Sequence, residues 1–143
     1  MIDKLITGAT AYRVEKAKTE WFVVKADKDS DWELPKSSVR RGESSVSALI
    51  RAMQEEIGIK GRVIEEAGRT SLSKIADGEA VNEKLLFYVV KISGAEDEKS
   101  RYSLVRWAQY GQAKKLLSLV REQKMLEQAQ EVLKQCRKEN KKL

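Results

Sequence analysis

The stretch that decides the fold runs from Leu34 to Ile59 and reads LPKSSVRRGESSVSALIRAMQEEIGI. Between Ser44 and Ile57 the spacing of apolar residues is that of one helical stripe, made by Val46, Leu49, Ile50, Met53 and Ile57. Ser44 or Ser45 can cap the start of this helix, and Gly58 suits the left-handed position after its end. The stretch therefore predicts a polar loop followed by an amphipathic helix.

Strand patterns lie on both sides of this stretch. Runs rich in aromatic and β-branched residues predict strands over 7–14, 21–24, 62–66, 85–92 and 104–107. Segment 73–84, between two of these strands, carries the turn signal Asp77-Gly78, and segment 94–100 is expected to be an acidic loop. Helical patterns follow over 112–120 and 122–138. Since no internal repeat or linker is visible, the simplest account is one α+β domain over 1–143, with a basic C-terminal helix from about 122 to 139.

Composition narrows the chemistry that is available to the chain. The 143 residues contain no histidine and one cysteine, Cys136. The lack of histidine excludes histidine-based nucleophilic catalysis and histidine zinc sites, so chemistry must rest on carboxylates, lysine, tyrosine, hydroxyls or a hard cation held by oxygens. One cysteine excludes an internal disulfide. The chain also has no run of about 18 apolar residues and no signal-like N-terminus. These features together predict a cytoplasmic protein that does not enter a membrane.

The net charge of +6 is concentrated at the C-terminal end. From Lys114 onward there are nine basic and four acidic residues, an excess of five, while the preceding 113 residues are nearly balanced. The favoured interpretation is a solvated helix face with a frayed tail; the alternative is a surface for nucleic acid or a protein partner. The apolar stripe of segment 122–138 predicts that this helix first packs against the domain. The oligomeric state stays open.

The stretch 34–59 resembles the Nudix box of hydrolases that act on a nucleoside diphosphate linked to another moiety. That box runs Gly, five residues, Glu, seven residues, Arg-Glu, an apolar residue, one residue, Glu-Glu, one residue, Gly and an apolar residue. The positions that match are Glu43, Arg51, Met53, Glu55, Glu56, Gly58 and Ile59, with Gly42 and the entry Leu34-Pro35-Lys36 also as commonly found. Two positions depart from the box, since Ser37 replaces its first Gly and Ala52 replaces the Glu after Arg51.

This resemblance implies a fold and a metal site. The fold is a Nudix-type α/β/α sandwich with a central mixed β-sheet, a Nudix helix and C-terminal helices. The site uses Glu55 and Glu56 as catalytic and metal-binding carboxylates, with the backbone carbonyl of Ser37 as a further ligand and Mg²⁺ or Mn²⁺ as the cation. Adjacent carboxylates on one helix face suit such a hard cation, which can bind phosphates at the same time. Ala48 and Ala52 are expected to leave room for the ligand.

The remaining box positions are implied to be structural. An ion pair between Glu43 and Arg51 would fix the loop to the helix, with Gly42 and Gly58 at backbone positions that the motif requires. Ala52 is the departure that affects chemistry, because in the family this position commonly supplies a metal ligand and is tied to activation of water. We therefore expect weakened metal binding and slow hydrolysis. A base from outside the box is then needed, and the candidates are Glu79, Glu83, Glu96 and Glu98.

Beyond the box the chain is most similar to the diadenosine tetraphosphate hydrolases. Trp32-Glu33-Leu34-Pro35-Lys36 looks like their entry to the box, and Lys84-Leu85-Leu86-Phe87-Tyr88 is similar to their Lys-x-x-x-Tyr strand. The resemblance places Lys36 and Lys84 near phosphates and Tyr88 near the nucleotide; the ordinary alternatives are a solvated edge lysine and a core tyrosine. Two functions stay open: a weakened magnesium-dependent nucleotide pyrophosphohydrolase, which the retained carboxylates favour, and a non-catalytic Nudix domain for nucleotide binding, regulation or protein interaction.

Overall fold

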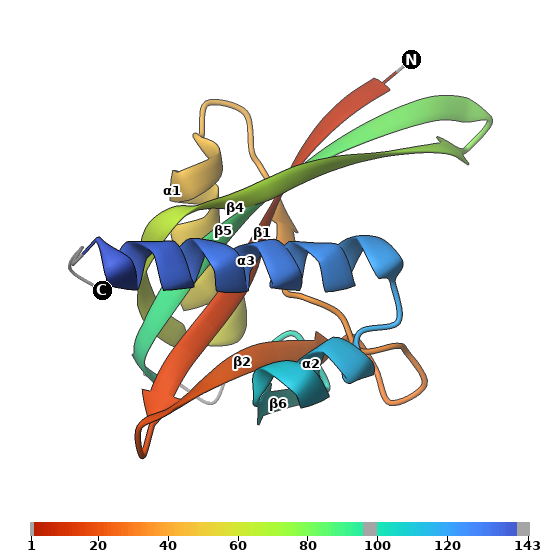
Figure 1. The fold of residues 1–143 in the computed structure, drawn as a ribbon. Coiled ribbons are helices and arrows are strands. Elements are labelled where there is room, and N and C mark those ends of the chain that lie inside the picture. Colours follow the sequence, from red (N-terminus) through yellow and green to blue (C-terminus); the bar gives the residue numbers. More distant parts are fainter. Residues whose placement is uncertain (1, 96–99, 140–143) are drawn as a thin grey trace.

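The computed structural model describes residues 2–95 and 100–139. Along the chain the elements are β1 (Ile2–Glu15), β2 (Lys18–Lys25), β3 (Lys36–Ser38), α1 (Ser45–Ala52), the π-helical turn η1 (Met53–Ile57), β4 (Ile59–Ala76), β5 (Glu79–Ala95), β6 (Leu104–Ala108), α2 (Tyr110–Leu116) and α3 (Val120–Lys138). The strands form one sheet in the order β4-β5-β1-β2-β6, with β3 paired to β1. Because β1 and β5 are parallel and the other pairs antiparallel, the sheet is mixed (Figure 1).

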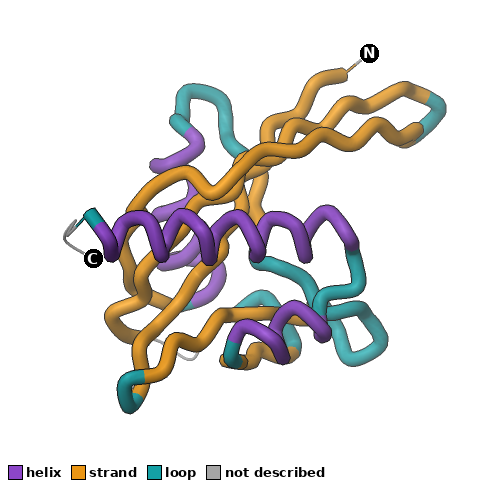
Figure 2. The backbone as a smooth tube through the Cα atoms, in the orientation of Figure 1, coloured by secondary structure: helices purple, strands orange, loops and turns teal. Residues whose placement is uncertain are grey.

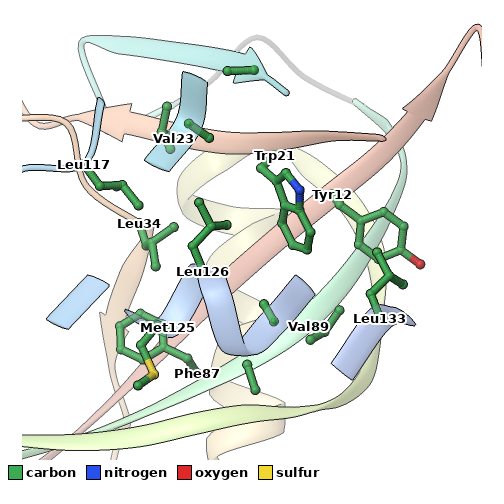
Figure 3. Packing of buried hydrophobic residues seen from close by; sticks show 14 of the residues in the cluster. Tyr12, Trp21, Val23, Leu34, Phe87, Val89, Leu117, Met125, Leu126 and Leu133 are labelled. Carbon is green, nitrogen blue, oxygen red and sulfur yellow. The ribbon is translucent and has the colours of Figure 1, made fainter. Parts of the chain in front are cut away.

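Helices cover both faces of the sheet (Figure 2). From the predicted stripe of the box helix, Leu49, Met53 and Ile57 pack on one face together with Phe22 and Tyr88, whereas Ile50 is 38% exposed. Met125, Leu126 and Leu133 of α3 pack on the other face with Trp21 and Phe87 (Figure 3). Neighbouring residues of β5 point to opposite faces, so a strand covered on both sides is apolar throughout. The expected α/β/α sandwich with a mixed sheet is confirmed, and so is the packing of the C-terminal helix against the domain.

The box helix begins and ends where the sequence indicates. Ser44 is the cap, and its side-chain oxygen accepts a bond from the backbone N–H of Ser47 at 3.1 Å. Gly58 ends the helix with a φ of 74°. The prediction of one uniform helix is incomplete, because its last turn is π-helical and the Gly58 N–H bonds to the Met53 carbonyl. This wider turn rotates Glu55 and Glu56 away from the positions that an ideal α-helix would give them.

The longest departure from the sequence prediction is the hairpin of β4 and β5. The predicted turn at Asp77-Gly78 is present, but the strands on both sides are longer than predicted and continue up to it. The φ angles of 52° and 78° at that dipeptide suit the tight turn whose twist matches two paired strands. The hairpin extends past the body of the domain, and the N-terminal part of β1 runs along it, paired to β5 from Ile2 onward (Figure 1).

The segment after β6 also differs from expectation. The helix expected over 112–120 occupies Tyr110–Leu116, because Leu117 is extended and pairs with Trp32 through an isolated bridge. A new helix, α3, then begins at Val120. In the described part of the chain, no helix has the length and apolar character needed to cross a membrane.

Candidate functional site

A cavity of about 420 Å³ opens between β3, the end of the box helix and the start of α3. Residues from β1 and β5 line its inner wall, among them Ile6 and Leu85. Its charged lining consists of five basic residues, Lys36, Arg40, Arg51, Arg101 and Arg121, and three acidic residues, Glu33, Glu56 and Glu83. A concave site with an excess of positive charge attracts anions, phosphates in particular.

One wall of the cavity is fixed by the ion pair between Glu43 and Arg51. Arg51 Nε donates to Glu43 Oε2 at 2.7 Å and Nη2 donates to Oε1 at 3.0 Å, so the contact is bidentate. The backbone N–H of Arg40 adds a bond of 2.9 Å to the same carboxylate. The Arg51 hydrogen bonds, followed by that backbone bond, lower the pKa of Glu43 to about 2. The pair expected from the box is present, and Gly42 beside it has a φ of 86°.

Glu56 is the box carboxylate that faces the cavity, and both of its oxygens have partners. The hydroxyl of Ser37 donates to Oε2 at 2.9 Å, and Arg101 Nε lies 3.7 Å from Oε1. The backbone N–H of Arg101 also donates to the Glu56 carbonyl at 2.8 Å. The side chain at the position of the first box glycine therefore holds the carboxylate that the resemblance assigns to a metal.

Glu55 and the two alanines do not line the cavity. Glu55 is exposed to solvent, which separates it from Glu56 although the two are adjacent in sequence. Ala48 and Ala52 are 0% and 4% exposed, because their side of α1 packs toward β1 and β3. The expectation that these alanines leave space for a ligand is wrong, since small residues here allow the helix to approach the sheet closely.

Lys36 is held at the cavity wall by a carboxylate that the sequence analysis missed. Its Nζ lies 2.6 Å from Glu122 Oε2 and 3.2 Å from Glu33 Oε1. The Glu122 side chain is fully buried, and its other oxygen accepts the Leu34 N–H at 2.7 Å. The available signal was its position three and four residues before Met125 and Leu126, which puts a carboxylate on the apolar side of the last helix.

Arg101 and Arg121 also line the cavity, and no sequence motif predicts them. Arg101 Nη2 donates to the Lys36 carbonyl and, at 2.7 Å, to the Tyr102 hydroxyl, and its guanidinium lies 4.6 Å from the centre of the Tyr102 ring. Tyr102 is buried, which raises its pKa and keeps the hydroxyl protonated. Arg121, in the first turn of α3, has a buried Nε for which the described residues supply no hydrogen-bond acceptor.

The other residues suggested by the resemblance lie elsewhere. Lys84 is exposed and is not a lining residue, because it points away from the face of β5 that carries Glu83 and Leu85. Tyr88 is 9% exposed and packs on the α1 side of the sheet, with its hydroxyl 2.5 Å from Ser45 Oγ. Both positions fit the ordinary alternatives, a solvated lysine and a core tyrosine.

The candidate bases are also spread over different places. Glu83 lines the cavity and lies 3.4 Å from Lys74 Nζ. Glu79 stands beside the turn at the far end of the β4–β5 hairpin, away from the cavity. Glu96 and Glu98 lie outside the described residues. Of the four candidates, Glu83 is thus the one that the described structure brings to the cavity.

Fold and box together define a class of protein, the Nudix domain. Residues 4–129 match the family model of the NUDIX domain, and the chain belongs to this family. The chain is 30% identical over 104 residues to a Mycobacterium tuberculosis protein that carries the name mutator protein MutT4. That match covers 71% of this chain but only 42% of the relative, so the chain spans about two fifths of the length of the curated relative it matches.

Solved structures share the fold at low sequence identity. An Ap4A hydrolase of C. elegans in a binary complex has a TM-score of 0.67 at 20% identity, covering 92% of this chain and 98% of that one. The Nudix domain of NrtR from Shewanella oneidensis, in complex with ADP-ribose, has a TM-score of 0.65 at 13% identity, covering 93% and 90%. Both comparisons agree with the sandwich described above.

Nudix hydrolases in general use divalent metal cations. Within residues 2–95 and 100–139 there is no group of three or more His, Cys, Asp or Glu side chains that could hold a metal ion. The box position that commonly supplies a ligand is Ala52, Glu55 faces solvent, and Glu56 is held by Ser37 and Arg101. The described residues therefore do not fit the metal site that the family implies.

Proposed function

We propose that this Nudix domain serves mainly to bind the phosphates of a nucleoside polyphosphate, and that the cavity at β3 is the binding site. The observation that carries the proposal is the charged lining of that cavity, five basic residues against three acidic ones, in a member of the Nudix family. Arg40, Arg101 and Arg121 would contact the phosphates, while Lys36 and Arg51 stay paired with carboxylates at the cavity wall. Lys84 and Tyr88 would take no part. We place the protein in the cytoplasm, where such ligands are abundant.

The volume and shape of the site agree with such a ligand. Small-molecule sites have volumes of roughly 300–1,000 Å³, and this cavity lies within that range at about 420 Å³. Apolar residues from β1 and β5, Ile6 and Leu85, form part of the wall and offer a surface for the nucleoside. The fold relatives named in complexes include one with ADP-ribose, in which a diphosphate joins adenosine to a ribose.

A second candidate function is slow hydrolysis of a nucleoside diphosphate linked to another moiety, a dinucleoside polyphosphate for example, with Mg²⁺ or Mn²⁺. Family membership and the presence of Glu56 and Glu83 in the cavity favour it. The absence of available metal ligands argues against hydrolysis, because Glu56 and Glu83 in the cavity already have cationic or hydroxyl partners. Binding and hydrolysis therefore need separate measurements.

The test measures both properties on the same ligands. ADP-ribose, diadenosine tetraphosphate and ATP are titrated into the protein by calorimetry, and turnover of each is followed by chromatography with Mg²⁺ and with Mn²⁺. We expect saturable binding and turnover far below the 1–10³ s⁻¹ that is typical of enzymes, roughly below 0.01 s⁻¹. Turnover at an ordinary enzymatic rate that Glu56→Gln abolishes would establish the hydrolase instead.

Two variants sharpen the assignment of the site. Arg121→Leu removes a cavity cation and should weaken nucleotide binding about tenfold, as expected for loss of a charge-assisted hydrogen bond. Lys84→Leu is the control, because it removes an exposed cation of β5 that lies outside the cavity. If both variants bind ATP as the unmodified protein does, the cavity is not the binding site.

A further inference from the structure

The residues of the cavity do not fit a metal site, which suggests how the cavity binds phosphates without a metal ion. This inference rests on the proposed function. We propose that Arg101 takes the place of the divalent cation, so that the cavity binds a diphosphate group directly through arginines. In the free protein the guanidinium of Arg101 lies beside Glu56, and the incoming phosphate takes over that partner. Binding then requires no metal ion.

The first argument is the position of Arg101 relative to Glu56. Its Nε lies 3.7 Å from Oε1, while the hydroxyl of Ser37 holds Oε2 at 2.9 Å. A divalent cation that bound this carboxylate would stand next to a guanidinium, and two positive charges at such a distance repel each other strongly. The charge that a metal would bring to this point of the cavity is already supplied by the protein.

The second argument is that Arg101 is held in place and still accessible. Its backbone N–H bonds to the Glu56 carbonyl at 2.8 Å, Nη2 bonds to the Tyr102 hydroxyl at 2.7 Å, and its guanidinium lies against the Tyr102 ring. Its side chain nevertheless remains 46% exposed. A guanidinium offers five N–H donors in one plane, so this anchoring leaves donors for phosphate oxygens.

The third argument comes from Arg121 on the α3 side of the cavity. Its Nε is buried, and the described part of the chain provides no acceptor for it. A buried donor without an acceptor is unfavourable, and such groups are rare in folded proteins. A phosphate oxygen in the cavity that Arg121 lines would supply the missing acceptor.

The balance of charge decides the class of ligand. Arg51 is neutralised by Glu43 and Lys36 by Glu122, so these two cations are already paired. Arg101, Arg121 and the exposed Arg40 remain, together with Glu56. Of the other two lining carboxylates, Glu33 lies 3.2 Å from Lys36 and Glu83 lies 3.4 Å from Lys74. A group with two or more negative charges on adjacent phosphates matches this arrangement, whereas a single carboxylate does not.

Inorganic pyrophosphate is the probe that tests this inference, because it contains the diphosphate and nothing else. Calorimetric titration of the full chain in EDTA should show saturable binding, and addition of Mg²⁺ should not strengthen it. Arg101→Leu should weaken binding in EDTA about tenfold or more. Arg106→Leu, at an exposed position of β6 outside the cavity, is the matched control and should bind as the unmodified protein does.

Glu56→Gln gives the sharpest test, because the two models predict effects of opposite sign. If Arg101 binds the phosphate, the neutral amide competes less for its guanidinium, and pyrophosphate binds more tightly. If a metal ion at Glu56 mediates binding, loss of the carboxylate weakens it. Circular dichroism and thermal unfolding of each variant establish that the fold is retained.

The failures of the two proposals are distinguishable. Binding that appears only with Mg²⁺ and is lost in Glu56→Gln would overturn the role of Arg101 and leave phosphate binding by the cavity intact. Binding in EDTA that survives both Arg101→Leu and Arg121→Leu would place the anion elsewhere and overturn the inference. If neither pyrophosphate nor any of the nucleotides binds under either condition, both proposals are wrong.

Discussion

Two carboxylates of the box, Glu43 and Glu56, each lie beside an arginine. The two contacts differ in distance and in the exposure of the arginine. Glu43 and Arg51 meet in a bidentate contact with distances of 2.7 and 3.0 Å, and the Arg51 side chain is 14% exposed. Glu56 and Arg101 approach to 3.7 Å, and the Arg101 side chain is 46% exposed. The first pair fixes the loop to the helix, whereas the second leaves the arginine able to exchange its partner for a ligand.

The closed region of the site extends to α3. Lys36 and the fully buried Glu122 make an ion pair that joins the entry of the box to the last helix, 86 residues away along the chain. Removing Glu122 is costly, because its other oxygen also accepts the Leu34 N–H, which would be left buried without an acceptor. This region is therefore structural, and the region around Arg101 is where recognition is expected.

The largest effect on stability is expected for Glu122→Ala, which breaks the closed region. It leaves the Leu34 N–H without its acceptor and Lys36 with Glu33 as its remaining carboxylate partner, so the free energy of unfolding should fall by about 1–3 kcal/mol. Urea denaturation followed by circular dichroism measures this change. Glu131→Ala, an exposed position on the same helix with a side chain 77% exposed, is the control and should change stability by less than about 0.5 kcal/mol. An equally small change for Glu122→Ala would contradict the structural role of the pair.

The next effect is a pH dependence of the Glu43–Arg51 pair. Because the pKa of Glu43 falls from 4.5 to about 2 on folding, the pair stabilises the protein at pH values above 4.5, and this contribution is lost as the pH falls toward 2. Glu43→Gln should thus be less stable than the unmodified protein at pH 6, and the difference should shrink between pH 4.5 and 2. Urea denaturation at a series of pH values measures it. A difference that is constant over this range would show that the carboxylate charge is not what stabilises the loop.

Tyr88→Phe is expected to have a smaller effect and to separate packing from recognition. The change removes the hydrogen bond to Ser45 and keeps the ring in the core, so stability should fall by about 1 kcal/mol. Since Tyr88 does not line the cavity, the affinity for ATP should stay unchanged within error. Thermal unfolding and calorimetric titration of the same sample measure the two quantities. A loss of affinity without a loss of stability would return Tyr88 to the nucleotide site.

The sequence predicts the box region well because its signals are local. The Ser44 cap, the apolar stripe and the left-handed Gly58 all depend on residues within a few positions of one another, and the structure contains each of them. The length of the β4–β5 hairpin was missed, since polar alternating residues in an exposed hairpin look like a loop when no partner strand is known. The split of Glu55 from Glu56 follows from helix geometry, because side chains at adjacent positions do not face the same direction.

The cavity itself was hardest to foresee because it is assembled from distant segments. Arg101 precedes β6, Arg121 lies in the first turn of α3 and Lys36 lies in β3, so that each is at least 20 positions from the others. Their proximity follows from the packing of α3 across the sheet, which the sequence indicates only as an apolar stripe. Basic residues in a loop and at a helix start are ordinary surface features, so their convergence becomes visible only in the folded chain.

The smallest expected effect concerns Ser37 and sharpens the contrast between the two pairs. Ser37→Ala removes the hydroxyl that holds Glu56 Oε2, which leaves Arg101 as the remaining side-chain partner of that carboxylate. The Glu56–Arg101 pair should then close, and pyrophosphate in EDTA should bind about two- to threefold more weakly, because it must displace a stronger competitor. Ser38→Ala, which changes a neighbouring lining residue without a side-chain bond to Glu56, is the control. Tighter binding in Ser37→Ala would mean that the hydroxyl does not keep the pair open, and the distinction between a closed pair and an exchangeable one would then rest on Arg101 exposure alone.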